Sequence, residues 1–245
     1  MTTDPALSFG QAARDYDRFR PPYPAEAAEW AVGSPPPARV VDLGAGTGIL
    51  TRALLDIGYE AVPVEPDAEM RAQLAAATPG AVPLGGSAEA IPLADGSADA
   101  VISGQAYHWF DLDKAHAEAA RVLRAGGTFA AIWNFRRSDV PWVAVLDKII
   151  RAAGGEEHEP DPRTFGPRFG PVERVEFRHE IDMTGDDLVG MMTTRSYYLV
   201  APPDGRRAIE DAVRELVTRH SDLAGREHFT LPYRTVVYRA STLRS

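Results

Sequence analysis

A glycine-rich turn follows the first strongly hydrophobic run of the chain. The run RVVDL (39–43) leads directly into GAGTG, which places glycine at Gly44, Gly46 and Gly48. Because glycine has no side chain, such a turn lets a ligand approach the backbone closely. Asp42 precedes the turn by two residues, and a carboxylate there attracts a ligand ammonium group and repels a pyrophosphate. These residues predict a site for a ligand with a positively charged end.

Two nucleotide-binding interpretations of this turn fit less well. A dinucleotide fingerprint would need glycine where the chain has Ile49, and a P-loop would need the GK[ST] that is absent here. A turn kept tight only for packing stays open. Glu65 favours the ligand-binding interpretation, because a carboxylate at the end of the next strand can accept hydrogen bonds from both ribose hydroxyls.

The elements around these residues alternate between strand and helix. Apolar and β-branched runs predict strands, and apolar residues at helical spacing predict helices. The expected strands span 39–43, 59–65, 81–86, 98–104 and 128–135, and the expected helices span 49–57, 67–77 and 111–124. Such alternation is typical of a parallel sheet whose strands end at one ligand-binding edge.

The pattern changes after residue 135. Later elements are expected as a helix (141–155), a Pro/Gly-rich loop (156–171), a strand (172–183), a helix and turn (185–200), an amphipathic helix after Pro203 and a final strand (228–240). A proline-rich arm and a short helix (25–32) precede the core. We predict one continuous domain in three parts: an arm and lid (1–37), a cofactor-binding half (38–135) and a C-terminal half with a substrate cap (136–245).

Composition narrows the class of protein. The 245 residues are 44% hydrophobic and 25% charged, which are ordinary globular values. The absence of cysteine excludes disulfides, thiolate zinc sites and cysteine nucleophiles, and the scattered histidines give little support to a metal cluster. No apolar run reaches the ~18–20 residues of a membrane span, and a net charge of −9 opposes generic nucleic-acid binding. We expect a cytoplasmic protein without metal, membrane or nucleic-acid partners.

Three motifs occur in order: VVDLGAGTGILT, VEPDAEM and GSAEAIPLADGSADAVISGQAYHWF. With the arm DYDRFRPPYP, they resemble the class I S-adenosylmethionine-dependent methyltransferases, most closely the small-molecule branch of trans-aconitate methyltransferase-like and ubiquinone-biosynthesis-like enzymes. The likeness is strong over 38–135 and weak beyond 140. It implies a Rossmann-like, seven-stranded, mostly parallel sheet with helices on both faces, an antiparallel final strand, an N-terminal helical lid and a cap inserted in the C-terminal half.

The resemblance also implies which residues bind S-adenosylmethionine. Asp42 and the glycine loop would hold the methionine part, Glu65 the ribose diol, and Pro66 and Met70 would flank the adenine. The implied cofactor-binding residues are Asp42, Gly44, Ala45, Gly46, Thr47, Gly48, Glu65, Pro66, Met70, Ser87, Ala88, Glu89, Ser103, Gly104 and Gln105.

The acceptor is expected beside AYHWF (106–110), which follows the strand 98–104 and so rims the same edge. His108 is a candidate general base, since histidine titrates near neutral pH; plugging of the core by these aromatic residues stays open. By the resemblance, the arm covers the cofactor, which makes Tyr16 the second candidate catalytic residue. The candidate substrate-binding residues are Tyr23, Tyr107, Trp109, Trp133, Arg195 (as a carboxylate anchor) and Tyr198.

The sequence therefore predicts a methyltransferase that moves a methyl group in line from S-adenosylmethionine to O, N or C of a small acceptor and releases S-adenosylhomocysteine. The acceptor is expected to be an acidic or aromatic metabolite or a natural-product intermediate. Three alternatives are a nicotinamide-dependent oxidoreductase, a non-catalytic S-adenosylmethionine-binding protein and a nucleic-acid methyltransferase, the last of which the net charge opposes. Asp42, Ile49 and the absence of a Tyr-x-x-x-Lys pair weigh against the oxidoreductase. Monomer and homodimer are both open.

Overall fold

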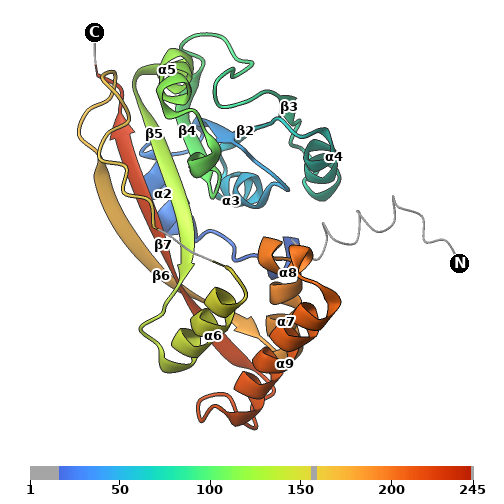
Figure 1. Cartoon of the computed structure of the whole chain (residues 1–245). Coiled ribbons are helices and arrows are strands. Elements are labelled where there is room, and N and C mark those ends of the chain that lie inside the picture. The colour runs from blue at the N-terminus through green and yellow to red at the C-terminus, as the bar shows by residue number, and fades with distance from the viewer. Residues whose placement is uncertain (1–16, 156–158, 244–245) are drawn as a thin grey trace, which may run out of the picture. The chain divides into compact units, whose positions relative to one another are not determined.

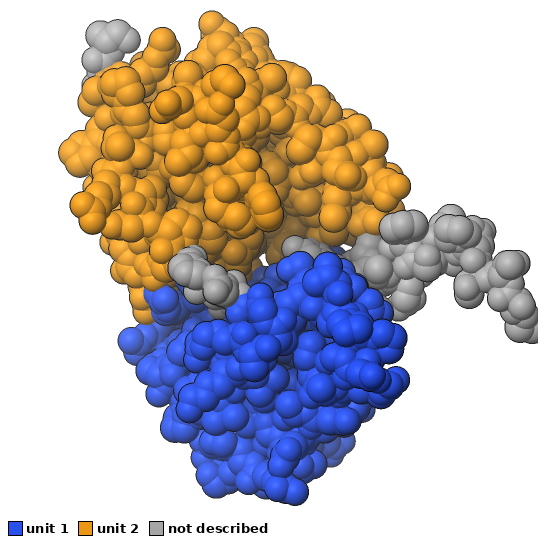
Figure 2. Space-filling view, in the orientation of Figure 1, with its two compact units in different colours: residues 1–21, 135–158, 178–234 blue, residues 22–134, 159–177, 235–245 orange. Residues whose placement is uncertain are grey.

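The computed structural model describes residues 17–155 and 159–243. The chain forms two compact units, each assembled from segments that are distant in the sequence (Figure 2). Unit 1 comprises Met1–Pro21, Phe135–His158 and Arg178–Arg234, and unit 2 comprises Pro22–Asn134, Glu159–Phe177 and Thr235–Ser245. The predicted division of the chain into three parts, with boundaries after residues 37 and 135, stays a prediction.

Seven strands form one sheet in the order β3-β2-β1-β4-β5-β7-β6 (Figure 1). The strands are β1 Arg39–Leu43, β2 Glu60–Glu65, β3 Leu84–Gly85, β4 Ala98–Gly104, β5 Leu123–Arg136, β6 Glu173–Met183 and β7 Phe229–Ser241. Strands β1 to β5 pair in parallel. Near the start of β5, Gly127 O accepts from the amide of Thr242, the residue after β7. At the other end, the amide of Arg137, the residue after β5, donates to Pro232 O near the start of β7. Strand β7 therefore runs antiparallel to β5, which confirms the predicted sheet.

The core of unit 2 covers both faces of the sheet. Ala130 and Ile132 of β5 belong to a cluster with buried residues of α2 (Ala25–Val32) and α3 (Ile49–Ile57). Neighbouring residues of a strand point to opposite faces. Phe129 accordingly lies on the other face, where its ring contacts His116 of α5 (Leu112–Val122) at 5.6 Å. Helices thus flank the sheet on both sides, as predicted.

Unit 1 has its own apolar core, built by four helices and parts of the long strands. The helices are α6 Pro141–Ala152, α7 Gly185–Thr193, α8 Ser196–Val200 and α9 Pro203–Arg219. Leu146, Leu188, Val213 and Tyr233 are almost completely buried in one cluster. Within the described residues, no helix combines the length and hydropathy needed to cross a bilayer.

Most predicted boundaries agree with the structure, and one is wrong in an informative way. Asp67 caps α4 (Ala68–Ala77) as predicted, since its carboxylate accepts from the amides of Glu69 and Met70. The helix expected over 111–124 instead ends at Val122, and β5 begins at Leu123. Leu123 pairs with Ala98 of β4 and is buried, so strand pairing prevails over the helical pattern.

The last glycine of the GAGTG loop is needed for packing. Gly48 has φ +87°, and a Cβ there would lie 2.8 Å from Leu74 Cγ of α4. We expect Gly48→Ala to lower the free energy of unfolding by about 2–4 kcal/mol, measured by urea denaturation. Gly80→Ala is the matched control, because Gly80 has φ +98° with open space around it. Equal losses in both variants would show that the contact with Leu74 is not what excludes a side chain.

Candidate active site

The carboxyl ends of β1, β2 and β4 meet at one edge of the sheet in unit 2. Asp42 of β1 lies in register with Pro63 on one side and Ile102 on the other. The loop after β1 is fastened to β2, because the amides of Gly44 and Ala45 both donate to Val64 O at 2.9 and 3.2 Å. The ends of these strands bring together residues that are up to sixty positions apart in the chain.

Asp42 is a buried carboxylate with one satisfied oxygen. Thr51 Oγ1, from the first turn of α3, donates to Asp42 Oδ2 at 2.6 Å. Among the described residues, Asp42 Oδ1 has no hydrogen-bond partner. Burial raises the pKa of Asp42 to about 7, and the hydrogen bond from Thr51 offsets part of this rise. A buried, unsatisfied carboxylate whose charge is disfavoured by burial is suited to a ligand ammonium group, which would stabilise the charge.

Glu65 ties the glycine loop to the end of β2. Its Oε2 accepts from Gly46 N at 2.9 Å, and its Oε1 accepts from Asp67 N at 3.0 Å. A carboxylate oxygen has two acceptor positions, so each oxygen can accept one further hydrogen bond. Two such acceptors side by side suit a pair of vicinal hydroxyl groups.

The three glycines of the loop differ in their surroundings. A Cβ on Gly44 would lie 2.7 Å from Ala106 Cβ, whereas no heavy atom lies within 4 Å of a Cβ on Gly46. Gly44 is therefore covered by the turn after β4, while Gly46 borders open space. Of the three, Gly46 leaves the backbone accessible to a ligand. Ala45 and Thr47, which alternate with the glycines in the loop, are buried.

The predicted adenine-binding residues lie on exposed or partly exposed segments of unit 2. Pro66 and Met70 are exposed at the end of β2 and on α4. The segment after β3 holds Ser87 and Glu89, with Ala88 buried between them. Glu89 Oε1 accepts from Asp111 N, the N-cap of α5, at 2.9 Å. The roles of these residues toward adenine stay predictions.

The end of β4 holds a second unsatisfied buried group. Ser103 is completely buried, and its Oγ has no hydrogen-bond partner among the described residues. Gly104 follows, and then Gln105 has φ +59°, a left-handed conformation that is uncommon for a non-glycine residue. The Gln105 amide Nε2 donates to Asn134 O of β5 at 3.1 Å. The strand end is thus held in a sharp turn beside the glycine loop.

The turn Tyr107–Trp109 presents its three side chains very differently. Tyr107 is buried, and its hydroxyl lies 3.0 Å from His116 Nε2. Burial raises the pKa of Tyr107 to about 12, so the phenol stays protonated at neutral pH. His108 is exposed, Trp109 is 80% exposed, and their ring centroids lie 4.8 Å apart. The structure places Tyr107 in the core and His108 and Trp109 at the surface.

The remaining predicted residues do not all belong to this unit. Trp133 of β5 is buried beside Tyr107, with ring centroids 5.7 Å apart. Arg195 and Tyr198 lie in unit 1, where the Tyr198 hydroxyl donates to Glu210 Oε1 at 2.6 Å. Tyr16 lies outside the described residues. The substrate-binding roles of these residues stay predictions.

Three residues hold the site together in ways that the sequence did not predict. Thr51 donates to Asp42, His116 hydrogen-bonds with Tyr107, and Asn134 bonds to Pro22, Gln105 and Thr235. Each interaction joins residues from different elements. No local pattern signals such pairs, although a polar residue within an apolar helix face or strand is a weak indication.

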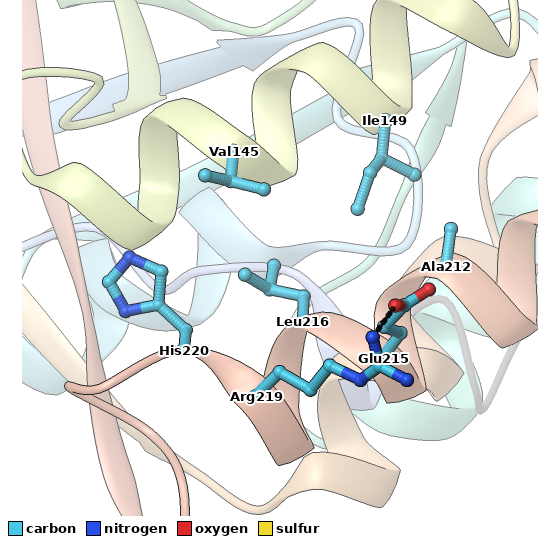
Figure 3. A pocket seen from close by; sticks show the side chains of 7 residues that line it. All are labelled: Val145, Ile149, Ala212, Glu215, Leu216, Arg219 and His220. Carbon is cyan, nitrogen blue, oxygen red and sulfur yellow. Dashed lines mark ion pairs between the residues drawn. The ribbon is translucent and has the colours of Figure 1, made fainter.

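A separate hollow of about 420 Å³ lies in unit 1 between α6 and α9 (Figure 3). Val145, Ile149 and Leu216 supply apolar side chains, and Glu215 pairs with Arg219 at 2.8 Å on its border. None of the predicted site residues lines this hollow. It is therefore not part of the site at the end of β1.

Comparison with known proteins decides the family. A sequence model of a protein family, described as a methyltransferase domain, matches residues 41–131. An uncharacterised methyltransferase of Mycobacterium tuberculosis is 42% identical over 240 residues, and the alignment covers 97% of both chains. The chain belongs to the class I S-adenosylmethionine-dependent methyltransferases. Membership in this methyltransferase family decides against the oxidoreductase alternative.

Two further similarities accord with this assignment. A solved structure from Anaeromyxobacter dehalogenans, described provisionally as a type II methyltransferase, has a TM-score of 0.72 at 25% identity and covers 92% of this chain and 99% of that chain. A malonyl-[acyl-carrier protein] O-methyltransferase of Methylococcus capsulatus is 39% identical over 168 residues, which are 62% of this methyltransferase and 58% of that one. The fold and enzyme class predicted from the sequence are confirmed.

Proposed function

We propose that this methyltransferase binds S-adenosylmethionine at the carboxyl edge of β1, β2 and β4 and methylates a small-molecule acceptor at O, N or C. The observation that carries the proposal is the buried Asp42 carboxylate, with one oxygen satisfied by Thr51 and the other without a partner in the described part of the chain. A buried unsatisfied acceptor is costly. The ammonium group of the methionine moiety would satisfy it.

The other residues of this edge fit the rest of the cofactor. Glu65 keeps acceptor capacity for the two ribose hydroxyls. Gly46 leaves open space beside the backbone, and the Ser103 hydroxyl, which has no partner among the residues that the structure describes, offers a second polar contact near Asp42. Bound there, the cofactor supplies a methyl group on an already activated sulfonium. The chain has then mainly to orient the acceptor, and alignment of reacting groups can contribute ~7–11 kcal/mol.

An acidic acceptor is the second part of the proposal. The relative from Methylococcus capsulatus acts on a malonyl group, whose terminal carboxylate is an oxygen nucleophile. Arg195 stays the predicted anchor for such a carboxylate. A carboxylate acceptor needs no base, whereas a phenol or a carbon acid would need one.

The test is acceptor-dependent release of S-adenosylhomocysteine from S-adenosylmethionine. The purified protein is incubated with pools of carboxylic acids, phenols and amines, with double-stranded DNA and structured RNA as further pools. Release that requires a carboxylic-acid pool supports the proposal. Release that requires only nucleic acid contradicts it.

His108 gives a prediction about the acceptor side. His108 is exposed as a residue, but partial desolvation of its ring lowers its pKa from the ordinary 6.5, so the imidazole is neutral at pH 7 and can accept a proton. For an acceptor that arrives protonated, His108→Ala should lower turnover by about 100-fold and leave S-adenosylhomocysteine affinity within about twofold of wild type, as measured by steady-state kinetics and calorimetry. Wild-type turnover should decline only as the pH falls through a value below 6.5.

A matched control separates a base from a general effect of losing histidine. His228 is exposed in unit 1 and pairs with Asp182 at 3.0 Å, so His228→Ala should behave as wild type. If His108→Ala also keeps wild-type turnover with such an acceptor, then His108 is not the base.

A further inference from the structure

Asn134 is a buried polar residue at the end of β5, with 5% of its surface exposed. Its side chain bonds in two directions within unit 2: Thr235 Oγ1 donates to Asn134 Oδ1 at 2.5 Å, and Asn134 Nδ2 donates to Pro22 O at 3.1 Å. Its backbone oxygen accepts from Gln105 Nε2 at 3.1 Å. Asn134 thus links the segment before α2, the end of β4 and, at Thr235, strand β7.

The bond to Pro22 fixes a segment that has few backbone donors. Proline has no amide hydrogen, so within Pro21-Pro22-Tyr23-Pro24 the backbone of Tyr23 alone can donate a hydrogen bond. The carbonyl that Asn134 holds belongs to the peptide bond directly before Tyr23. Its geometry therefore helps to decide where the Tyr23 side chain lies.

Tyr23 lies directly on the end of β4. A Cβ on Gly104 would be 2.7 Å from the Tyr23 hydroxyl oxygen and 3.2 Å from Leu50 Cδ2. The phenol oxygen therefore occupies the space that any side chain at position 104 would need. Tyr23 is buried between the end of β4 and the first turn of α3, two elements that border Asp42.

We propose that Asn134 is a positioning residue of the cofactor site, which acts by holding the Pro22 carbonyl so that the Tyr23 phenol covers Gly104. This inference rests on the proposed function, because the edge that Tyr23 covers is the one proposed to hold the methionine part of the cofactor. In this arrangement Tyr23 excludes water from the end of β4, and Asn134 has no contact with the cofactor itself.

The test is a double-mutant cycle on S-adenosylhomocysteine affinity, measured by calorimetry on the full chain. Asn134→Ala should weaken binding about tenfold, as expected for one lost hydrogen bond that orders a ligand-covering segment. Tyr23→Ala should weaken binding at least as much. The double variant should bind no more weakly than Tyr23→Ala, because Asn134 acts through Tyr23.

Thr235→Val is the matched control, since it removes the other hydrogen bond of the Asn134 side chain and keeps the bond to Pro22. It should bind S-adenosylhomocysteine within about threefold of wild type, even if its melting temperature falls as much as that of Asn134→Ala. Should Asn134→Ala not fold, Asn134→Ser replaces it, because the shorter side chain stays polar and no longer reaches Pro22.

Two results would overturn the inference alone: wild-type affinity in the Asn134 variant, or losses that add in the double variant, which would make Asn134 a general structural residue. If the wild type itself binds no S-adenosylhomocysteine, the proposed function fails and this inference fails with it.

Discussion

Asp42→Asn should lower the affinity for S-adenosylhomocysteine by roughly 100-fold while the protein stays folded. The amide keeps an oxygen for the 2.6 Å hydrogen bond from Thr51 and loses the charge that would pair with the ligand ammonium group. Buried charge-assisted hydrogen bonds are worth about 1.5–3 kcal/mol each, which corresponds to a loss of this size. Calorimetric titration of wild type and variant at pH 8 measures it.

The free energy of unfolding of Asp42→Asn shows whether its loss of affinity comes from the lost contact or from unfolding. Burial raises the pKa of Asp42 from 3.8 to about 7, so the native state keeps a proton that the unfolded chain loses between these two values. The group therefore destabilises the ligand-free protein as the pH rises through this window, by on the order of 4 kcal/mol above pH 7. Asp42→Asn removes this cost, and its free energy of unfolding at pH 8 should be no lower than that of the wild type.

The same ionisation makes binding dependent on pH. A carboxylate pairs with an ammonium group only when it is ionised, so below pH 7 the ligand must displace a proton from Asp42. Wild-type affinity should fall by up to tenfold per pH unit below 7, and Asp42→Asn should not show this dependence. Asp56→Asn, on the exposed side of α3, is the control and should bind as wild type. An Asp42→Asn variant that binds within threefold of wild type would remove Asp42 from the ammonium role.

Glu65→Ala should also weaken binding by roughly 100-fold. The variant loses both acceptors for the ribose hydroxyls and frees the amides of Gly46 and Asp67, at about 1–3 kcal/mol for each unsatisfied group. Glu60→Ala is the matched control on the same strand, because Glu60 is exposed and pairs only at the surface with Arg39 at 3.0 Å. Its affinity should equal that of wild type.

A modified ligand separates the ribose contact from the loop contact. The 2′,3′-dideoxy form of S-adenosylhomocysteine lacks the two hydroxyls, so it should bind wild type much more weakly than the parent compound. In Glu65→Ala the two ligands should bind almost equally. If the variant loses the same factor for both ligands, then Glu65 serves only to hold the loop.

The fold could be predicted largely from local patterns. The run 39–43, the helix 49–57 with Gly58 after it, and the Asp67 cap all depend on neighbours in the chain, and the structure has them at the expected positions. The predicted end of α5 was wrong because Leu123 is fixed by pairing with Ala98, a partner that is distant in the sequence.

The site was predictable in part for the same reason. The place of Asp42 and Glu65 at one edge could be predicted, because the ends of parallel strands meet there. The contacts of Thr51 and Asn134 could not be predicted, since they join residues of different elements. Tyr107 was predicted to bind the acceptor, with packing into the core left open. The structure has its ring buried against His116, and its role toward the acceptor stays a prediction.

The most direct test of the proposed cofactor site is calorimetric titration of the wild-type protein with S-adenosylhomocysteine at pH 6, 7 and 8, with NAD titrated in parallel. We expect micromolar binding of S-adenosylhomocysteine that strengthens from pH 6 to pH 8, and no binding of NAD. Binding of NAD alone, or of neither compound at any pH, would contradict the proposed site.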